Sequence, residues 1–432
     1  MKKINTAPIS GMQELLPREQ AIFDQIKSQI MQVYHLHGFN HIETPMIDRT
    51  EILLAKAGGD TEKQIYKVVK TAETSDDADQ ALRFDHTVPL ARYVVEHQND
   101  LAFPFRVSQF GRNFRGERAQ KGRFREFYQM DADIIGRNTL PIGYDAEVVA
   151  TAFYALSQFV KTPILVRLSN RKILAGLLEA LTLTEKSSEI YGIIDHAEKV
   201  PAEVTETKLR EQVSDESKIQ TLLQFVQIRG PRSEVAKKLT ALGIENETFM
   251  TGVSELLLVL DLLEAQGIGQ SVVADMLIIR GLDYYTGTVF ETLLPEYKNL
   301  GSICSGGRYD NLASNYTEEK FPGVGISIGL TRLFYCLSAN NLLDSYQSAP
   351  VEYCVVPISD AEIAYAYQIV AHLISQGASA DLCLLDKKLG DKIKYASKVA
   401  ENVIIIGENE AERRTYQVKN LTTGEQKTFN LN

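Results

Sequence analysis

The segment from Phe105 to Gln129 most constrains how this chain folds. It reads FRVSQFGRNFRGERAQKGRFREFYQ and gathers a dense cluster of cationic side chains in an otherwise acidic chain. We interpret it as two strands joined by a loop near Gly116 to Gly122, because side chains alternate with a period of two on either side of that loop. Arginines fixed on a sheet bind phosphate through paired N–H donors, so we expect an anionic ligand at this hairpin.

The alternation also predicts which side chains share a face of the hairpin. One parity holds Arg115, Arg123, Arg125, Phe127, Gln129, Asp131 and Asp133. That face offers guanidinium groups for phosphate, a ring for stacking, and carboxylates for a cationic or N–H-bearing ligand. A solvated, salt-bridged hairpin is the alternative, and the acids, amide and aromatic ring on the same parity argue against it.

The composition limits the classes of protein that remain. The chain has 432 residues, 44% hydrophobic and 24% charged, which is typical of a globular protein with two or three domains. A net charge of −10 argues against coating nucleic acid through bulk electrostatics, so a nucleic-acid partner must meet local patches. The N-terminal residues lack the apolar run of a signal peptide, and no window of about 18 uninterrupted apolar residues occurs, so we expect a cytoplasmic protein without membrane contact.

The cysteines and histidines give no sign of a metal site. The four cysteines lie far apart with no C-x-x-C pair, and the seven histidines show no H-E-x-x-H spacing. We therefore expect buried thiols, no zinc and no metal held by a protein motif. Neither a P-loop nor a G-x-G-x-x-G fingerprint occurs, so no Rossmann site is predicted, and a bound nucleotide must be held by arginines on an antiparallel sheet.

Helix and strand patterns alternate along the first 345 residues. Residues 18–37 have apolar side chains at helical spacing and end at Gly38, and residues 39–44 read as a strand. Residues 82–87 alternate as a strand that places Arg83, Asp85 and Thr87 on one face, with a helix starting at Val88. Residues 168–270 read as an inserted helical subdomain.

The remaining segments complete a predicted α+β organisation. Residues 323–332 read as a glycine-rich strand that delivers Arg332 at the start of a helix. A separate α/β domain is predicted from residue 350 to 432, with strands near residues 353–357, 379–385 and 403–406.

Several short motifs occur in order along the chain. They are the helix ending at Gly38 with the strand to Pro45, Phe114–Glu117 (FRGE), Arg280–Gly287 (RGLDYYTG), Ser305–Asp310 (SGGRYD) and Gly329–Arg332 (GLTR). In this order they resemble the three motifs of class II aminoacyl-tRNA synthetases together with two blocks specific to the histidyl-tRNA synthetase family. The resemblance covers nearly the whole chain. It implies an antiparallel-sheet catalytic core over residues 1–345, flanked by helices and carrying the helical insertion, and an anticodon-binding domain over residues 350–432.

The resemblance also implies roles for individual residues. Arg115 and Arg280 are the implied catalytic arginines at the ATP α-phosphate, with Arg280 also beside the substrate carboxylate. The residues implied to bind ATP are Arg115, Glu117, Arg123, Phe127 and Arg332. Those implied to bind histidine are Asp85, Thr87, Gln129, Asp133, Tyr284 and Tyr285. Arg118 and Gln120 at the hairpin tip are implied to approach the tRNA acceptor end.

The implied partners are L-histidine, ATP with Mg²⁺, and tRNA(His), in a homodimer built through motif 1 and without an organic prosthetic group. The chain departs from the family at Gln13, where an arginine is frequent, so the role of that arginine is not carried over. Two alternatives stay open: a non-catalytic histidine-binding regulatory paralogue, and a sensor of uncharged tRNA. Retained catalytic arginines and a C-terminal domain argue against the first, and the absence of a kinase signature argues against a stress-kinase sensor.

Overall fold

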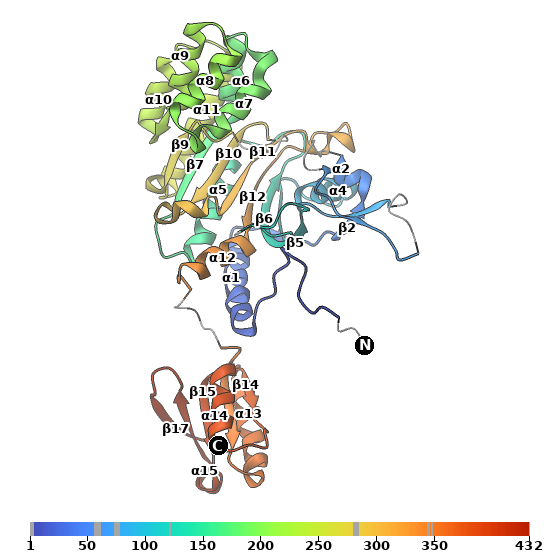
Figure 1. The fold of residues 1–432 in the computed structure, drawn as a ribbon, viewed down its shortest axis with the longest axis vertical. Coiled ribbons are helices and arrows are strands. Elements are labelled where there is room, and N and C mark those ends of the chain that lie inside the picture. The colour runs from blue at the N-terminus through green and yellow to red at the C-terminus, as the bar shows by residue number, and fades with distance from the viewer. Residues whose placement is uncertain are drawn as a thin grey trace. The chain divides into compact units, whose positions relative to one another are not determined.

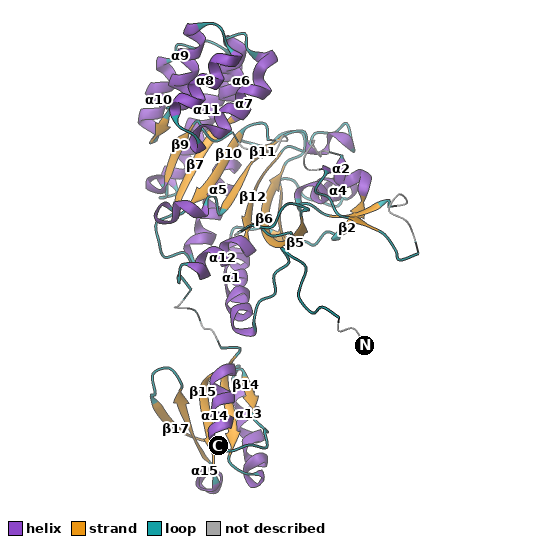
Figure 2. Ribbon diagram, viewed as in Figure 1, coloured by secondary structure: helices purple, strands orange, loops and turns teal. Residues whose placement is uncertain are grey.

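The computed structural model describes residues 4–55, 62–72, 78–120, 122–279, 285–343, 346 and 349–431. The chain divides into two compact units, each described by itself. The first comprises Met1–Gln13 and Ser28–Leu342, and the second comprises Glu14–Lys27 and Leu343–Asn432. Figure 1 labels the elements along the chain, and Figure 2 separates helices from strands. Among the described helices, none combines the length and apolar character needed to cross a membrane.

The first unit is built on a large mixed sheet, with nine strands in the described ranges. Their order is β1 (Asn40–His41), β5 (Phe105–Phe114), β6 (Glu126–Ile135), β12 (Gly323–Gly329), β11 (Cys304–Tyr309), β10 (Thr288–Leu293), β7 (Leu165–Asn170), β9 (Val272–Asp275) and β8 (Arg229–Gly230). The run from β5 to β7 is antiparallel, as predicted. The pairs β1–β5 and β7–β9 are parallel, which the prediction of an antiparallel sheet missed.

Strand β6 shows why one face of this sheet is core and the other is open. Met130, Ala132 and Ile134 are fully buried, and α5 (Gly143–Ser157) and α12 (Leu330–Ala339) pack against β6 and β12. The phenol of Tyr34, in α1 (Pro17–Leu36), donates to the Met130 carbonyl at 3.1 Å. Because side chains alternate, the intervening residues of β6 point to the opposite face.

Two predicted strands are wrong in their extent. Of the strand expected over residues 39–44, only the two residues of β1 form a strand. The helix before it ends near Gly38 (φ +78°), as predicted. The strand expected over residues 82–87 stops with β4 (Gln80–Leu82), and α4 (Thr87–Glu96) follows. The Asp85 carboxylate accepts a hydrogen bond from the Val88 N–H at 3.0 Å, and this contact at the first turn favours a helix start.

β4 is the middle strand of a small sheet beside the main one. It pairs with β2 (Ile47–Arg49) and β3 (Lys67–Val68), and α2 (Thr50–Leu54) follows β2. Short 3₁₀ turns lie at Thr184–Lys186, Ala197–Lys199, Gly269–Ser271, Pro295–Leu300, Leu312–Asn315 and Asp360–Glu362.

A helical insertion connects β7 to its parallel neighbour β9 (Figure 1). Its helices are α6 (Arg171–Ala180), α7 (Ser187–His196), α8 (Ala202–Gln212), α9 (Glu216–Val226), α10 (Arg232–Ala241) and α11 (Glu247–Ala265). The predicted range of 168–270 is therefore slightly too wide, because residues 168–170 belong to β7. Helices α6 and α11 pack closely: a Cβ on Gly176 would lie 2.2 Å from the Phe249 nitrogen, and one on Gly252 would lie 2.7 Å from the Ile173 nitrogen.

The second unit contains an α/β fold, and its three predicted strands are confirmed. The five strands of its described part lie in the order β14 (Ala380–Leu382), β13 (Val351–Pro357), β15 (Ala400–Ile406), β16 (Thr415–Asn420) and β17 (Gln426–Asn430). The pairs β13–β14 and β13–β15 are parallel, and the last two pairs are antiparallel. Its helices are α13 (Ile363–Ser375), α14 (Leu389–Val399) and α15 (Glu408–Arg413).

Candidate functional site

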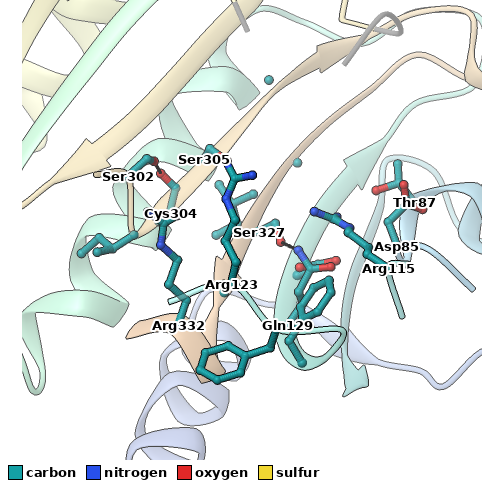
Figure 3. A pocket seen from close by; sticks show the side chains of 18 of the residues that line it. Asp85, Thr87, Arg115, Arg123, Gln129, Ser302, Cys304, Ser305, Ser327 and Arg332 are labelled. Carbon is teal, nitrogen blue, oxygen red and sulfur yellow. Dashed lines mark hydrogen bonds between the residues drawn. The ribbon is translucent and has the colours of Figure 1, made fainter. Parts of the chain in front are cut away.

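A cavity of about 450 Å³ opens on the uncovered face of the main sheet. It is bordered by β6, β11 and β12, the loop of the arginine hairpin, and the starts of α4 and α12. The predicted site residues that line it are Asp85, Thr87, Arg115, Glu117, Arg123, Phe127, Gln129, Asp133, Tyr285 and Arg332. Side chains from segments more than 200 residues apart in sequence therefore meet in one place (Figure 3).

Glycines hollow out one end of the cavity. Asp133 on β6 pairs across the sheet with Gly325 on β12, which pairs in turn with Gly307 on β11. A Cβ on Gly325 would lie 1.9 Å from Asp133 Oδ1, and one on Gly307 would lie 2.9 Å from the Tyr285 ring. These glycines thus make room for an acid and an aromatic ring rather than serving as turn residues.

Asp133 is the most perturbed acid of this end. It is 4% exposed, and its Oδ1 accepts a hydrogen bond from the Tyr309 hydroxyl at 2.9 Å. Burial raises the pKa of Asp133 well above its ordinary value, and the charges of Asp131 and Asp85 raise it further, against the effect of the Tyr309 hydrogen bond. Burial and the neighbouring Asp133 likewise raise the pKa of Tyr309 well above its usual range. The pair can accept an N–H group from a buried polar ligand.

The guanidinium of Arg115 lies over two aromatic rings. Its guanidinium carbon lies 4.3 Å from the centre of the Phe84 ring and 4.9 Å from that of Phe127, and its Nε donates to the Phe84 carbonyl at 3.3 Å. This double contact fixes the plane of the fork, and the side chain extends into the cavity in Figure 3. A planar cation held in this way suits a phosphate oxygen pair.

Arg123 and Arg332 add positive charge at the same end. Arg123 pairs with Glu117 at 3.3 Å, and this pair is partly exposed. Arg332, in the first turn of α12, donates to the Leu300 carbonyl at 2.5 Å, so the prediction of a strand that delivers this arginine at a helix start is confirmed. Arg125 does not line the cavity: its Nε donates to the Glu117 carbonyl at 3.0 Å.

Gln129 and Asp85 also line the cavity. The Gln129 amide is held on both sides, accepting from Asn113 Nδ2 and donating to Ser327 Oγ, each at 2.6 Å. Burial raises the pKa of Asp85, while the Val88 N–H and the charge of Arg115 lower it. The cavity therefore runs from a cationic end to an acidic end.

Some predicted residues lie elsewhere. Arg118 and Gln120 are exposed in the hairpin loop and do not line the cavity. Arg83 does not share a face with Asp85 and Thr87: it is 4% exposed, and its NH1 donates to the Thr44 carbonyl at 2.7 Å. The predictions for Arg280 and Tyr284 fall outside the described residues. Within the described ranges there is no group of three or more His, Cys, Asp or Glu side chains suited to a metal ion.

Sequence reasoning assigned no role to Tyr309, Ser327 or Gly325, although all three line the cavity. The sequence of β12 could have indicated these cavity residues, because small residues occupy alternate positions from Gly323 to Gly329. Such a pattern indicates a strand face that another side chain or a ligand approaches closely.

Two protein families match the chain in sequence. Residues 11–333 match the family described as histidyl-tRNA synthetase, and residues 352–432 match the anticodon binding domain. A histidine–tRNA ligase of Clostridium tetani is 43% identical over 436 residues, covering 100% of this chain and 98% of the relative.

Solved structures of similar proteins agree with these sequence matches. The histidyl-tRNA synthetase of Nostoc sp. PCC 7120 superposes with a TM-score of 0.89 at 35% identity, covering 99% of this chain and 97% of the other. An ATP phosphoribosyltransferase regulatory subunit/histidyl-tRNA synthetase from Bacillus halodurans shares the fold at 22% identity, with a TM-score of 0.75 and coverage of 94% and 99%. Because both the family match and the full-length relatives span nearly all of the chain, it belongs to the histidyl-tRNA synthetase family of class II aminoacyl-tRNA synthetases, with an anticodon-binding domain at its C-terminus.

Proposed function

We propose that the chain is a histidine–tRNA ligase that activates L-histidine with ATP to histidyl-adenylate and transfers histidine to the 3′ end of tRNA(His). Family membership supports this activity. The single observation that carries the mechanism is the polarity of the cavity, in which a set of arginines and a buried acid–tyrosine pair line the same space. A molecule with an imidazole at one end and a carboxylate near a phosphate at the other fits this polarity.

The acidic end takes the amino acid. Asp133 and Tyr285 face the imidazole, and Asp85, Thr87 and Gln129 bind the ammonium group. Tyr284 belongs to the same set. A buried carboxylate can accept one imidazole N–H while a tyrosine hydroxyl donates to the other ring nitrogen, a pattern that few other amino acids can match. A site that depends on such hydrogen bonds rejects analogues lacking them by about 10⁴–10⁵-fold, so no editing site is needed.

The cationic end takes ATP as its Mg²⁺ complex. Arg115 grips the α-phosphate, Glu117 and Phe127 hold the adenine side, and Arg123 and Arg332 neutralise the terminal phosphates. The histidine carboxylate is already ionised at neutral pH, since its reference pKa is around 3.5, so attack on phosphorus needs no general base. Positioning and charge neutralisation then lower the barrier, with Mg²⁺ sharing the phosphate charge. Arg280 stabilises the charge that develops on the α-phosphate.

The proposal extends to the rest of the chain. Residues 1–345 form the catalytic domain, and residues 350–432 bind the anticodon. Arg118 and Gln120, exposed at the hairpin tip, meet the acceptor end of tRNA(His). The protein works as a cytoplasmic homodimer assembled through motif 1.

Pyrophosphate exchange into ATP, assayed with each amino acid in turn, tests this proposal. Only L-histidine should support exchange, and the Arg280→Ala variant should lower the rate of adenylate formation by about 10²–10³-fold with little effect on histidine affinity. A regulatory paralogue would bind histidine without exchange, which would contradict the proposal. An Arg280→Ala rate within a few-fold of wild type would remove the role given to that arginine.

A further inference from the structure

A buried histidine–aspartate pair borders the amino-acid end of the cavity. His86 Nδ1 and Asp131 Oδ2 are 2.8 Å apart, and the two residues are 1% and 3% exposed. His86 follows Asp85 in the chain, and Asp131 lies between Gln129 and Asp133 on the cavity face of β6. None of the other hydrogen bonds described above involves either residue.

One oxygen of this pair has no partner in the protein. Asp131 Oδ1 forms no hydrogen bond with any of the described residues, although Asp131 lines the cavity. A buried polar atom without a partner costs about 1–3 kcal/mol, and native structures keep few of them. A ligand that donates to this oxygen would remove that cost on binding.

The shape of the site leaves room for such a ligand. Asp131 has Gln109 of β5 as its cross-strand neighbour on one side and Ser327 of β12 on the other, and Ser327 pairs in turn with Ser305 on β11. Both serines line the cavity, so small side chains flank Asp131 on its β12 side.

The charges around Asp131 indicate which ligand group fits. Its charge raises the pKa of both Asp85 and Asp133, so the three carboxylates interact with one another across the amino-acid end. Two arginines interact with these acids: the buried Arg83 with Asp131, and Arg115, at the phosphate end, with Asp85. A cationic N–H donor placed among the carboxylates would relieve their mutual repulsion.

We propose that Asp131 binds the ammonium group of the amino acid together with Asp85, and that His86 is the positioning residue that holds the Asp131 carboxylate in place. The inference rests on the proposed function, since it deepens the assignment of the amino-acid end. His86 donates its Nδ1–H to Oδ2, which fixes the carboxylate plane and leaves Oδ1 for the substrate. The ammonium subsite therefore has two carboxylates rather than one.

Binding of three probes to the full-length protein separates this role from a structural one. L-histidine and L-histidinol carry an ammonium group, whereas imidazole-4-lactate has a hydroxyl in its place. Asp131→Asn should weaken binding of the first two by about 10- to 100-fold, the range for a lost charge-assisted hydrogen bond. Binding of imidazole-4-lactate should stay within about threefold. The matched control Asp133→Asn should weaken all three, because all three carry the imidazole.

Variants at His86 test the positioning role. His86→Leu removes the donor to Asp131 and should weaken histidine and histidinol by about tenfold, again without affecting imidazole-4-lactate. His86→Asn puts an amide N–H where Nδ1 stood and should restore affinity to within about threefold of wild type. Equal losses for all three probes in Asp131→Asn, or no rescue by His86→Asn, would overturn the proposal.

A structure of the wild-type protein with L-histidinol keeps the proposal testable if the variants do not fold. The ammonium nitrogen should lie within about 3.2 Å of Asp131 Oδ1, and a separation beyond about 4 Å would overturn the proposal. The outcomes also separate the two hypotheses. Absent pyrophosphate exchange in the wild type refutes the proposed function, whereas normal exchange with unchanged ammonium binding in Asp131→Asn refutes only this inference.

Discussion

Replacing Asp133 by Asn should make the protein more stable and less active at the same time. The Asn side chain has the same shape, and its carbonyl can still accept the Tyr309 hydroxyl, which now bonds Asp133 Oδ1 at 2.9 Å. Only the charge is lost. Since hydrogen bonds to charged groups contribute about 1.5–3 kcal/mol, kcat/KM for histidine should fall by about 10- to 100-fold, with KM for ATP nearly unchanged.

The stability change has the opposite sign because of the raised pKa of Asp133. The folded state holds the Asp133 proton more tightly than the unfolded state, whose ordinary pKa is 3.8, so ionisation at neutral pH destabilises the fold. Asn removes that cost. The resulting gain in the free energy of unfolding should be absent below pH 3.8. It should grow as the pH rises toward the folded-state pKa of Asp133 and should be constant above that pKa. The expected gain in the free energy of unfolding is about 0.5–2 kcal/mol, the usual size of a single stabilising substitution.

Thermal unfolding at a series of pH values, run beside pyrophosphate exchange, measures both effects. The unfolding temperature of Asp133→Asn should exceed that of the wild type at pH 8, and the difference between the two temperatures should be smaller at pH 5. A variant that loses stability and activity together would show that Asp133 supports the fold through its charge. Equal changes in KM for histidine and for ATP would remove its assignment to the imidazole.

Three further predictions address other parts of the site. Arg115→Lys keeps the charge but loses the two contacts between the guanidinium and the rings, each worth about 0.5–2 kcal/mol. Single-turnover adenylate formation should therefore slow by at least tenfold. An unchanged rate would show that the orientation of the Arg115 guanidinium is not needed. Gly325→Ala places a methyl group 1.9 Å from Asp133 Oδ1 and should weaken histidine binding in calorimetry, whereas Gly390→Ala, with nothing within 4 Å, should have no effect. Gln120→Ala should impair charging of tRNA(His) more than charging of a tRNA(His) that lacks its 5′-terminal nucleotide, and equal losses would argue against base reading by this residue.

The residues of β6 could be predicted because one local rule decides them. Strand alternation alone placed Phe127, Gln129 and Asp133 on one face, and all three line the cavity. Arg125 has the same parity but lies just before β6 begins, where the ladder no longer dictates its direction. Local rules therefore hold within an element and fail at its ends.

Contacts between distant segments could not be predicted. Arg83 has the parity of Asp85, yet it is drawn into the core by the Thr44 carbonyl, 39 residues earlier, and by the Arg112 carbonyl, 29 residues later. The parallel pairing of β7 with β9 could not be predicted for the same reason, because the sequence of a strand does not specify which strand it pairs with. The glycines of β11 and β12 were visible, but their purpose depends on Asp133 and Tyr285, which approach from other segments.

The route of the chain between β7 and β9 suggests how the family can vary without risk to its chemistry. Parallel neighbouring strands need a crossover of a dozen or more residues, and α6 with α11, packed through Gly176 and Gly252, already provides one. Helices α7 to α10 elaborate on that crossover, although the chain between α9 and α10 returns to the sheet as its edge strand β8. Because β8 is the edge strand beyond β9, these helices can be exchanged, shortened or fused to a foreign module while the arginine hairpin and the glycine-lined strands keep their geometry. This segment is therefore a natural place for evolution or design to add a new specificity.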